Sequence, residues 1–306
     1  MTTRFNRRKA LQFGLAAGVG AGLLPGRAGA ESMPDTARIL VGFPPGGAPD
    51  LVSRRLAEQL NGKLAKSVIV DNRPGAGGRI AADVARQAPA DGLTLLMNPA
   101  GMLTINPHVY KRLNYDPFKD FAPISIAAVV DFGFGVGPAV PQDVKSIADF
   151  SAWAKSNLAK ASYGSPAAGA PPHFVGDAVS RALGIHMTHI AYRGGSPALN
   201  DLMGGQLTSL VLTLGDMIQN ARAGRLRLLA STGPARSRFS PQVPTFAEQK
   251  VHGLDHRDWF GVYIAGKPSP AVLARVGPLV RGALSSRDYI LGLNSAGIEA
   301  SSGTPS

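Results

Sequence analysis

The stretch RILVGFPPGGAPDLVSRRLAEQLNG, residues 38–62, carries the most information about the fold class of this chain. Ile39 to Phe43 is an almost unbroken apolar run, which is typical of a buried strand. Pro44-Pro45-Gly46-Gly47 ends that strand, and apolar residues then recur at the spacing of one helix face as far as Leu60. Asn61-Gly62 ends the helix. The order strand, turn, helix predicts a βα unit.

The same alternation continues along the chain and predicts an α/β fold with mostly parallel sheets. Further strands are expected at 68–70, 94–97, 207–214, 225–231 and 259–264, and residues 106–123 resemble irregular surface chain. The strand at 259–264 is expected to lead back into the first lobe, so the chain would cross twice between two lobes. We therefore expect lobe 1 to comprise residues 31–131 and 257–306, and lobe 2 to comprise residues 132–256.

The first thirty residues have the pattern of a removable export signal. Cations between Arg4 and Lys9 precede an apolar stretch from Leu11 to Leu24, and Ala28-Gly29-Ala30 forms a small-residue cleavage site. The apolar stretch is shorter than the roughly 20 residues that span a bilayer. The adjacent Arg7 and Arg8 favour the twin-arginine route, with the general secretory route as the alternative. We expect residues 1–30 to be removed and the mature protein to be free in the periplasm.

The composition excludes several classes of protein. There is no cysteine, so disulfides, thiolate nucleophiles, cysteine metal sites and a lipid-modified N-terminal cysteine are excluded. The signal holds five cations and no anions, so its removal lowers the formal charge from +12 to +7. A moderately basic chain suits anionic small molecules, and no cluster of Lys and Arg interleaved with aromatics points to nucleic acid.

Two loops are candidates for holding an anion. In Phe43 to Asp50, glycines at a strand-to-helix turn leave backbone N–H groups open at a helix N-terminus, where an anion is favoured. The alternative is that Gly46-Gly47 only make a tight turn and that Asp50 only caps the helix. Tyr163 to His173 follows the same logic in the second lobe, with Ser165 and His173 as side-chain candidates. For His173 a helix-capping role is the alternative.

No catalytic, cofactor or metal motif is found in the sequence. Gly75-Ala76-Gly77-Gly78-Arg79-Ile80 lacks the third glycine of a dinucleotide loop, and Gly164-Ser165-Pro166 lacks the flanking glycines of a nucleophile elbow. His252 and His256 have no glutamate beside them, so the zinc-protease pattern fails. We therefore expect neither catalysis, nor a cofactor, nor a metal.

Several longer motifs lie in a characteristic order: FPPGG with Asp50, DNRPGAGG at 71–78, APADGLTLL at 88–96, YDPFKDF at 115–121, and further short matches at 164–173, 192–194, 204–206, 223–227 and 243–246. Together they resemble the substrate-binding proteins of tripartite tricarboxylate transporters, often called the Bug family. The resemblance covers nearly all of residues 38–300. It implies a type II periplasmic-binding-protein fold: two α/β lobes with a ligand cleft between them that closes over the ligand.

The resemblance also implies which residues hold the ligand. A carboxylate would be held by backbone amides and water from the two loops, with further contacts along the cleft. The implied positions are Phe43, Pro45, Gly46, Gly47, Ala48, Asp50, Asn98, Ala100, Ser165, Ala167, Gly169, His173, Tyr192, Thr213 and Asp216. Ala167, Ala170 and Thr213 depart from the usual residues of the family, which puts ligand choice in question. Relatives also continue with a helix after a Gly-Thr-Pro like that at 303–305, so a shortened C-terminus is expected.

These observations predict a monomeric periplasmic receptor that captures a small organic carboxylate and presents it to the membrane subunits of a transporter. A dicarboxylate, a tricarboxylate, an amino acid or an aromatic acid would all satisfy the two loops. One alternative is a receptor that reports its ligand to a signalling partner. A more remote one is an α/β hydrolase that uses Ser165 or His173.

Overall fold

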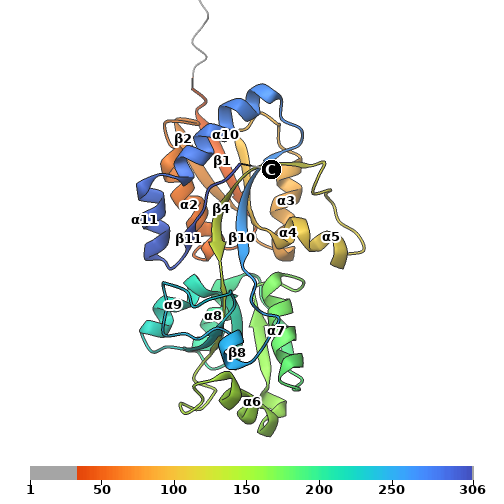
Figure 1. Ribbon diagram of the computed structural model, residues 1–306. Helices are drawn as coiled ribbons and strands as arrows, with labels where there is room; N and C mark the ends of the chain where they lie inside the picture. The colour runs from red at the N-terminus through yellow and green to blue at the C-terminus, as the bar shows by residue number, and fades with distance from the viewer. Residues whose placement is uncertain (1–32, 305–306) are drawn as a thin grey trace, which may run out of the picture. The chain divides into compact units, whose positions relative to one another are not determined.

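The computed structural model describes residues 33–304, so the predicted export signal lies outside the described residues. The strands form two sheets (Figure 1). The strands are β1 (Thr36–Val41), β2 (Ser67–Asn72), β3 (Thr94–Pro99), β4 (Phe121–Val130), β5 (Phe132–Val136), β6 (Ser162–Ser165), β7 (Thr188–Ala191), β8 (Ser209–Thr213), β9 (Arg227–Ser231), β10 (Asp258–Ala265) and β11 (Glu299–Ala300). We call each sheet with its covering helices a lobe.

Ten α-helices and three short 3-10 turns connect the strands within the described residues. The helices are α2 (Ala48–Leu60), α3 (Arg79–Arg86), α4 (Gly101–Thr104), α5 (Asn106–Val109), α6 (Ile147–Ser156), α7 (Pro171–Ala182), α8 (Gly195–Met203), α9 (Leu214–Arg222), α10 (Pro270–Leu284) and α11 (Arg287–Ser295), and the turns are η1 (Ala76–Gly78), η2 (Leu158–Lys160) and η3 (Ala247–Gln249). No helix among residues 33–304 is long and apolar enough to cross a membrane.

The first lobe is built on a six-stranded sheet in the order β11-β4-β10-β3-β1-β2. Helices α2, α10 and α11 lie on one side of it, and α3, α4 and α5 lie on the other (Figure 1). The larger core joins Leu56 of α2, Val280 of α10 and Tyr289 of α11 to the sheet. A smaller core joins the alanines of α3 to the opposite face. Burial on both faces explains why β1 and β3 are apolar runs without alternation.

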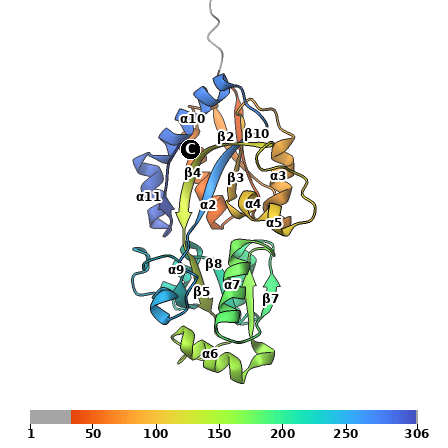
Figure 2. The same ribbon diagram turned by 45° about the vertical axis from the view of Figure 1, so that its right-hand side comes forward.

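The second lobe is built on a five-stranded sheet in the order β7-β6-β8-β5-β9. One core packs Phe150 of α6 and Val179 of α7 against Phe134 of β5. Another packs Leu202 of α8 and Met217 of α9 against β8. Figure 2 shows α7 along β6 and β7, with α6 at the end away from the first lobe. Each face of this sheet therefore also has its own core.

The sheets are mixed, and the expectation of mostly parallel sheets is wrong. β1 pairs in parallel with β2 and β3, and β6 pairs in parallel with β7 and β8. However, β10 runs antiparallel to both β3 and β4, and β5 runs antiparallel to β8 and β9. The strands next to the two passages between the sheets form the antiparallel pairs β4 with β10 and β5 with β9, because a chain that leaves one sheet and returns to it comes back in the reverse direction. β11 also runs antiparallel to β4.

Only one residue, Asp131, separates β4 in the first sheet from β5 in the second. The chain returns between β9 and β10. Arg257, directly before β10, donates to Asp131 at 2.8 Å and also pairs with Glu299 of β11 at 2.6 Å. The two passages are thus tied together by an ion pair at the junction of the sheets.

Candidate functional site

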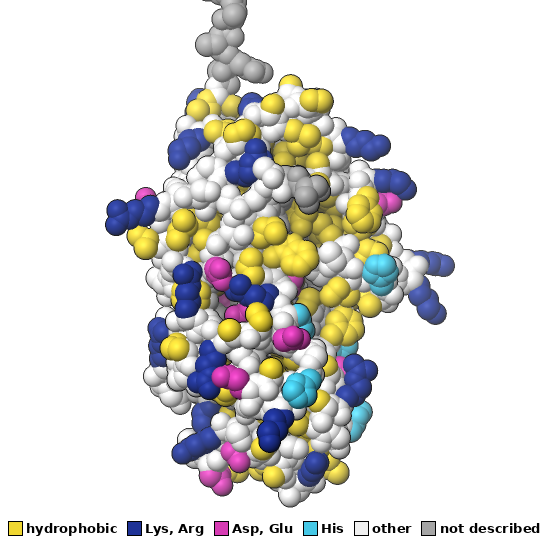
Figure 3. Space-filling model, in the orientation of Figure 1, with side chains coloured by type: hydrophobic (Ala, Val, Ile, Leu, Met, Phe, Trp, Pro, Cys, Tyr) yellow, Lys and Arg dark blue, Asp and Glu magenta, His cyan; other side chains and the backbone are white. Residues whose placement is uncertain are grey.

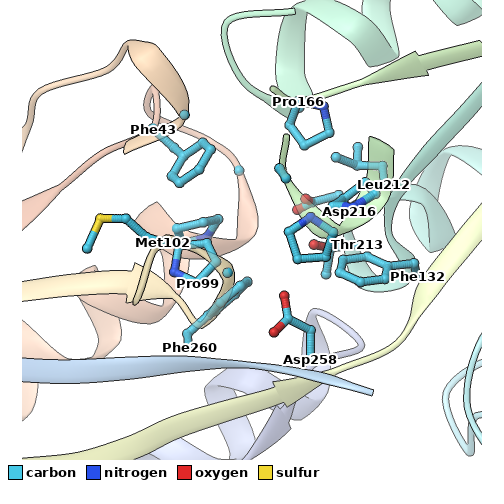
Figure 4. Close-up of a pocket in the computed structure, with 18 of the residues that line it drawn as sticks. Phe43, Pro99, Met102, Phe132, Pro166, Leu212, Thr213, Asp216, Asp258 and Phe260 are labelled. Carbon is cyan, nitrogen blue, oxygen red and sulfur yellow. The ribbon is translucent and has the colours of Figure 1, made fainter. Parts of the chain in front are cut away.

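A cavity lies between the two lobes and holds about 710 Å³ of space not filled by protein, part of it open to solvent. The first lobe contributes the loop before α2, the end of β3 and the start of α4 and β10, and the second lobe contributes the loop before α7, the end of β8 and the start of α9. Figure 4 shows Phe43, Pro99, Met102 and Phe260 facing Pro166, Leu212 and Phe132 across this space. Most of the wall is apolar, which suits the body of a small organic molecule.

The loop before α2 presents the backbone N–H of Gly47 to this region. Gly47 caps α2 without a side-chain hydrogen bond. The Gly47 N–H donates no hydrogen bond to any of the described residues. The α2 helix has 13 residues, so the partial positive charge of its N-terminus adds to this donor. Gly46 adopts φ +87°, which turns the chain so that Gly47 can begin the helix.

Asp50 braces this loop rather than facing the cavity. Its carboxylate accepts from the Gly46 N–H at 3.0 Å, from Arg54 at 2.9 Å and from Asn72 at 2.9 Å. Burial alone would raise the pKa of Asp50, but these donors outweigh burial and lower the pKa. Asp50 therefore stays ionised and holds the turn in shape.

The loop before α7 offers fewer donors than the sequence suggested. The first two residues of α7, Pro171 and Pro172, have no N–H. The His173 N–H donates to Ala170 at 2.9 Å, and the Gly169 N–H donates to Nδ1 of His173 at 3.1 Å. This loop contributes Pro166, Ala168, Ala170 and the two prolines to the cavity, so its contribution there is largely apolar.

Behind this loop, Ser165 lies 2.7 Å from Nε2 of His189, a distance that would suit a nucleophile and its base. Ser165 is fully buried, however, and its hydroxyl also donates to the Ala167 carbonyl at 3.1 Å. His189 stacks on His173 with 3.8 Å between ring centres. Burial, and then the neighbouring His173, lower the pKa of His189 to about 4. The pair is closed off from substrate and supports the loop.

The structure brings only some of the sequence-predicted residues to the cavity wall. Four of them line it: Phe43, Gly47, Thr213 and Asp216. Gly46 borders a neighbouring hollow with Asp216, and Ala167 and Tyr192 border another with Phe43. The remaining residues lie behind these walls or beside them: Pro45, Ala48, Asp50, Asn98, Ala100, Ser165, Gly169 and His173. Asn98, for example, is fully buried beneath Gly42 and Gly78.

Other lining residues were missed by sequence reasoning, and Asp258 is the most informative of them. It begins β10, and its carboxylate points into the cavity (Figure 4). The side chains of Met102, Phe132, Leu212 and Phe260 were missed as well. The only sequence signal for Asp258 is an acidic residue at the start of an apolar strand, directly where the chain returns to the first lobe.

The cavity contains two acidic side chains with raised pKa values. Burial raises the pKa of Asp216 to about 7, against the opposing effect of the nearby Ala48 N–H. Burial also raises the pKa of Asp258 to about 6, although its own carboxylate accepts from the Trp259 N–H at 2.9 Å. Among residues 33–304, no group of three or more His, Asp or Glu is placed to hold a metal ion.

Comparisons with known proteins agree with this architecture. A profile described as "Tripartite tricarboxylate transporter family receptor" matches residues 52–304. The UPF0065 protein in the tcbD-tcbE intergenic region of Pseudomonas sp. (strain P51) is 31% identical over 269 residues, covering 87% of this chain and 79% of that protein. The solved structure of R. palustris Rpa4515 with adipate has a TM-score of 0.83 at 30% identity, covering 89% of this chain and 90% of that chain. Periplasmic binding protein BugD has a TM-score of 0.80 at 27% identity, covering 87% and 88%.

Two α/β lobes around a cavity, shared with these solved neighbours, define a periplasmic solute-binding protein. Within that class, the chain belongs to the tripartite tricarboxylate transporter receptor family. This confirms both the family resemblance in the sequence and the expected fold class. The family is one of receptors and not of enzymes.

Proposed function

We propose that this protein captures a small organic carboxylate in the cavity between its lobes and presents it to the membrane subunits of a tripartite transporter. The observation that carries the proposal is the loop of Phe43 to Gly47, which borders the cavity directly before a 13-residue helix with no side-chain cap. Unpaired N–H groups at a helix N-terminus favour a carboxylate. Rpa4515, which has the same fold, was solved with adipate.

In this proposal the Gly47 amide at the start of α2 holds the carboxylate, and the apolar wall surrounds the rest of the ligand. Thr213 and Asp216 border the same space from the second lobe. Near neutral pH a fraction of Asp216 is protonated, because its pKa is about 7. A protonated Asp216 donates a hydrogen bond to the ligand carboxylate instead of repelling it.

We propose the remaining properties on the same basis. Lobe 1 comprises residues 31–131 and 257–306, lobe 2 comprises 132–256, and the mature protein is a free periplasmic monomer without catalytic activity. The burial of Ser165 supports the last point, because a nucleophile must reach its substrate. Lys and Arg are spread over the face seen in Figure 3 rather than gathered in one patch, as suits a receptor for small molecules.

Two variants at one position test the role of the loop. Gly47→Pro removes the N–H group, whereas Gly47→Ala keeps it and adds a Cβ whose nearest neighbour is a side-chain atom at 3.9 Å. The ligand is first chosen from a panel of dicarboxylates, tricarboxylates, amino acids and aromatic acids by its effect on the melting temperature. We expect Gly47→Pro to weaken binding of that ligand roughly tenfold, as loss of a hydrogen bond to a charged group does, with Gly47→Ala close to wild type.

Three results would count against the proposal. The first is that no member of the panel raises the melting temperature. The second is that both variants bind the ligand as the wild type does, and the third is that both lose binding equally. Circular dichroism of each variant confirms that the fold is intact before affinities are compared.

A further inference from the structure

The acidic groups of the cavity are unusual for a site that takes an anion. Asp258 is 6% exposed, and Asp216 borders the same space from the second lobe. Among the described residues, no Lys, Arg or His side chain lines this cavity. A cavity that binds only an anion is not expected to have carboxylates in its wall, because like charges repel each other in a poorly hydrated space.

Asp258 lacks a cationic partner of its own. Its hydrogen bond within the protein comes from the backbone N–H of the next residue, Trp259. No ion pair to Asp258 is formed by any residue from 33 to 304. Burying an ionised carboxylate without a partner is costly, and such groups in proteins are normally paired. The carboxylate points into the cavity (Figure 4), so a ligand can supply the missing partner.

A second hollow next to the cavity has the opposite charge. It shares Phe43, Gly77, Pro166 and Ala168 with the cavity and is bordered by Arg79 and Arg193. Arg79 is held in place, because its guanidinium lies 3.9 Å from the centre of the Tyr110 ring and donates to the Ala76 carbonyl. The cleft therefore has an acidic part and a basic part side by side, which suits a molecule with charges of both signs.

We propose that the cavity selects carboxylates that also carry a cationic nitrogen, and that Asp258 binds that nitrogen. This rests on the proposed function, since the carboxylate of the same ligand is held at the Gly47 amide. The apolar side chains between, such as Phe260 and Met102, surround the carbon skeleton. The ligand class is a small zwitterion, of which amino acids are the simplest members.

Matched pairs of probes test the proposal by isothermal titration at pH 7.5. One pair is phenylalanine and 3-phenylpropionate, and another is glutamate and glutarate, so that each pair differs only by the ammonium group. We expect the zwitterion of at least one pair to bind wild type roughly tenfold or more tightly than its partner, as a charge-assisted hydrogen bond provides. In Asp258→Asn the preference falls to about threefold or less, while binding of the acid without nitrogen is unchanged or tighter.

Asp255→Asn is the control, because it removes an exposed carboxylate three residues away on the same returning segment. It is expected to keep the wild-type preference. A third probe for the first pair, phenethylamine, has the ammonium group of phenylalanine and no carboxylate.

The outcomes separate this proposal from the proposed function. If the acids bind but the zwitterions gain nothing, or if Asp258→Asn keeps the preference, the role of Asp258 is refuted and carboxylate capture stands. If phenethylamine binds as tightly as phenylalanine, the ammonium site stands and carboxylate capture is refuted. If no probe of either pair binds, selection of zwitterions is refuted, and carboxylate capture is then decided by the wider panel.

Discussion

Replacing Asp258 by Asn should make the unliganded protein more stable at neutral pH. The carboxylate is 6% exposed and has no cationic partner among residues 33–304, and burial raises its pKa from 3.8 to about 6. Each pKa unit corresponds to ~1.4 kcal/mol, so the ionised form destabilises the folded state by at most about 3 kcal/mol. Asparagine keeps the acceptor for the Trp259 N–H and carries no charge. We expect a gain of about 2 kcal/mol at pH 8, once local relaxation has reduced the full cost.

The sign of the pH dependence follows from the raised pKa. Between pH 3.8 and about 6 the folded state holds a proton on Asp258 that the unfolded state has lost. The stabilisation from that proton is complete below pH 3.8 and is lost as pH rises through 6. Asp258→Asn should therefore exceed wild type at pH 8 and match it near pH 4. Tyr263, on the same strand, stays neutral throughout, because burial and then the charge of Asp258 raise its pKa to about 12.

Urea unfolding of both proteins at pH 4, 6 and 8 measures this difference. Asp216 titrates in the same cavity but is present in both proteins, so its contribution cancels in the comparison. At pH 8 the melting temperature of the variant should also be higher, by about 5 °C for a gain of this size. If the variant is no more stable than wild type at pH 8, or if the gain is the same at pH 4, the carboxylate is not desolvated as described. A gain in stability together with a loss of zwitterion binding would mean that the buried charge is retained for function.

Two further predictions concern the second lobe. The pKa of His189 is lowered to about 4, so its contribution to stability is present above pH 6.5 and is lost as pH falls toward 4. In His189→Gln, the free energy of unfolding measured with urea should therefore fall less between pH 6.5 and 4.5 than in wild type. An unchanged pH dependence would contradict this. Gly194 has φ +108° and a Cβ there would lie 2.4 Å from Pro44 of the first lobe, whereas Gly224 has φ +71° and open space around it. Gly194→Ala should therefore bind the ligand at least tenfold more weakly than wild type in a titration, whereas Gly224→Ala should bind as wild type does. Equal affinities of the two variants would show that ligand binding does not need the contact between Gly194 and Pro44.

The sequence predicted the local elements well where one face is buried. α2 runs from Ala48 to Leu60 and ends at Asn61, as the spacing of its apolar residues and the turn residues indicate. In α3 the larger apolar residue Ile80 is 46% exposed, while Ala81, Ala82 and Ala85 are buried. Alanines let this short helix approach the sheet closely, so size and not hydrophobicity decides which side faces inward.

The family motifs located the loop at Phe43 to Asp50, and the structure brings that loop to the cavity wall. They could not separate residues that line the cavity from residues that support them. Asp50 and Ser165 belong to the same motifs as Gly47, yet hydrogen bonds within the loops turn their side chains away from the cavity.

The sequence by itself determined the fold class, because hydrophobic periodicity and turn residues act over a few residues and are visible in the order of the chain. The pairing of β10 between β3 and β4, and the position of Asp258 opposite Thr213 and Asp216, were decided only by the tertiary structure. These residues are more than forty positions apart in the chain, and their proximity depends on how two complete lobes pack. The charge inside the cavity is for that reason a property of the folded molecule and not of any one motif.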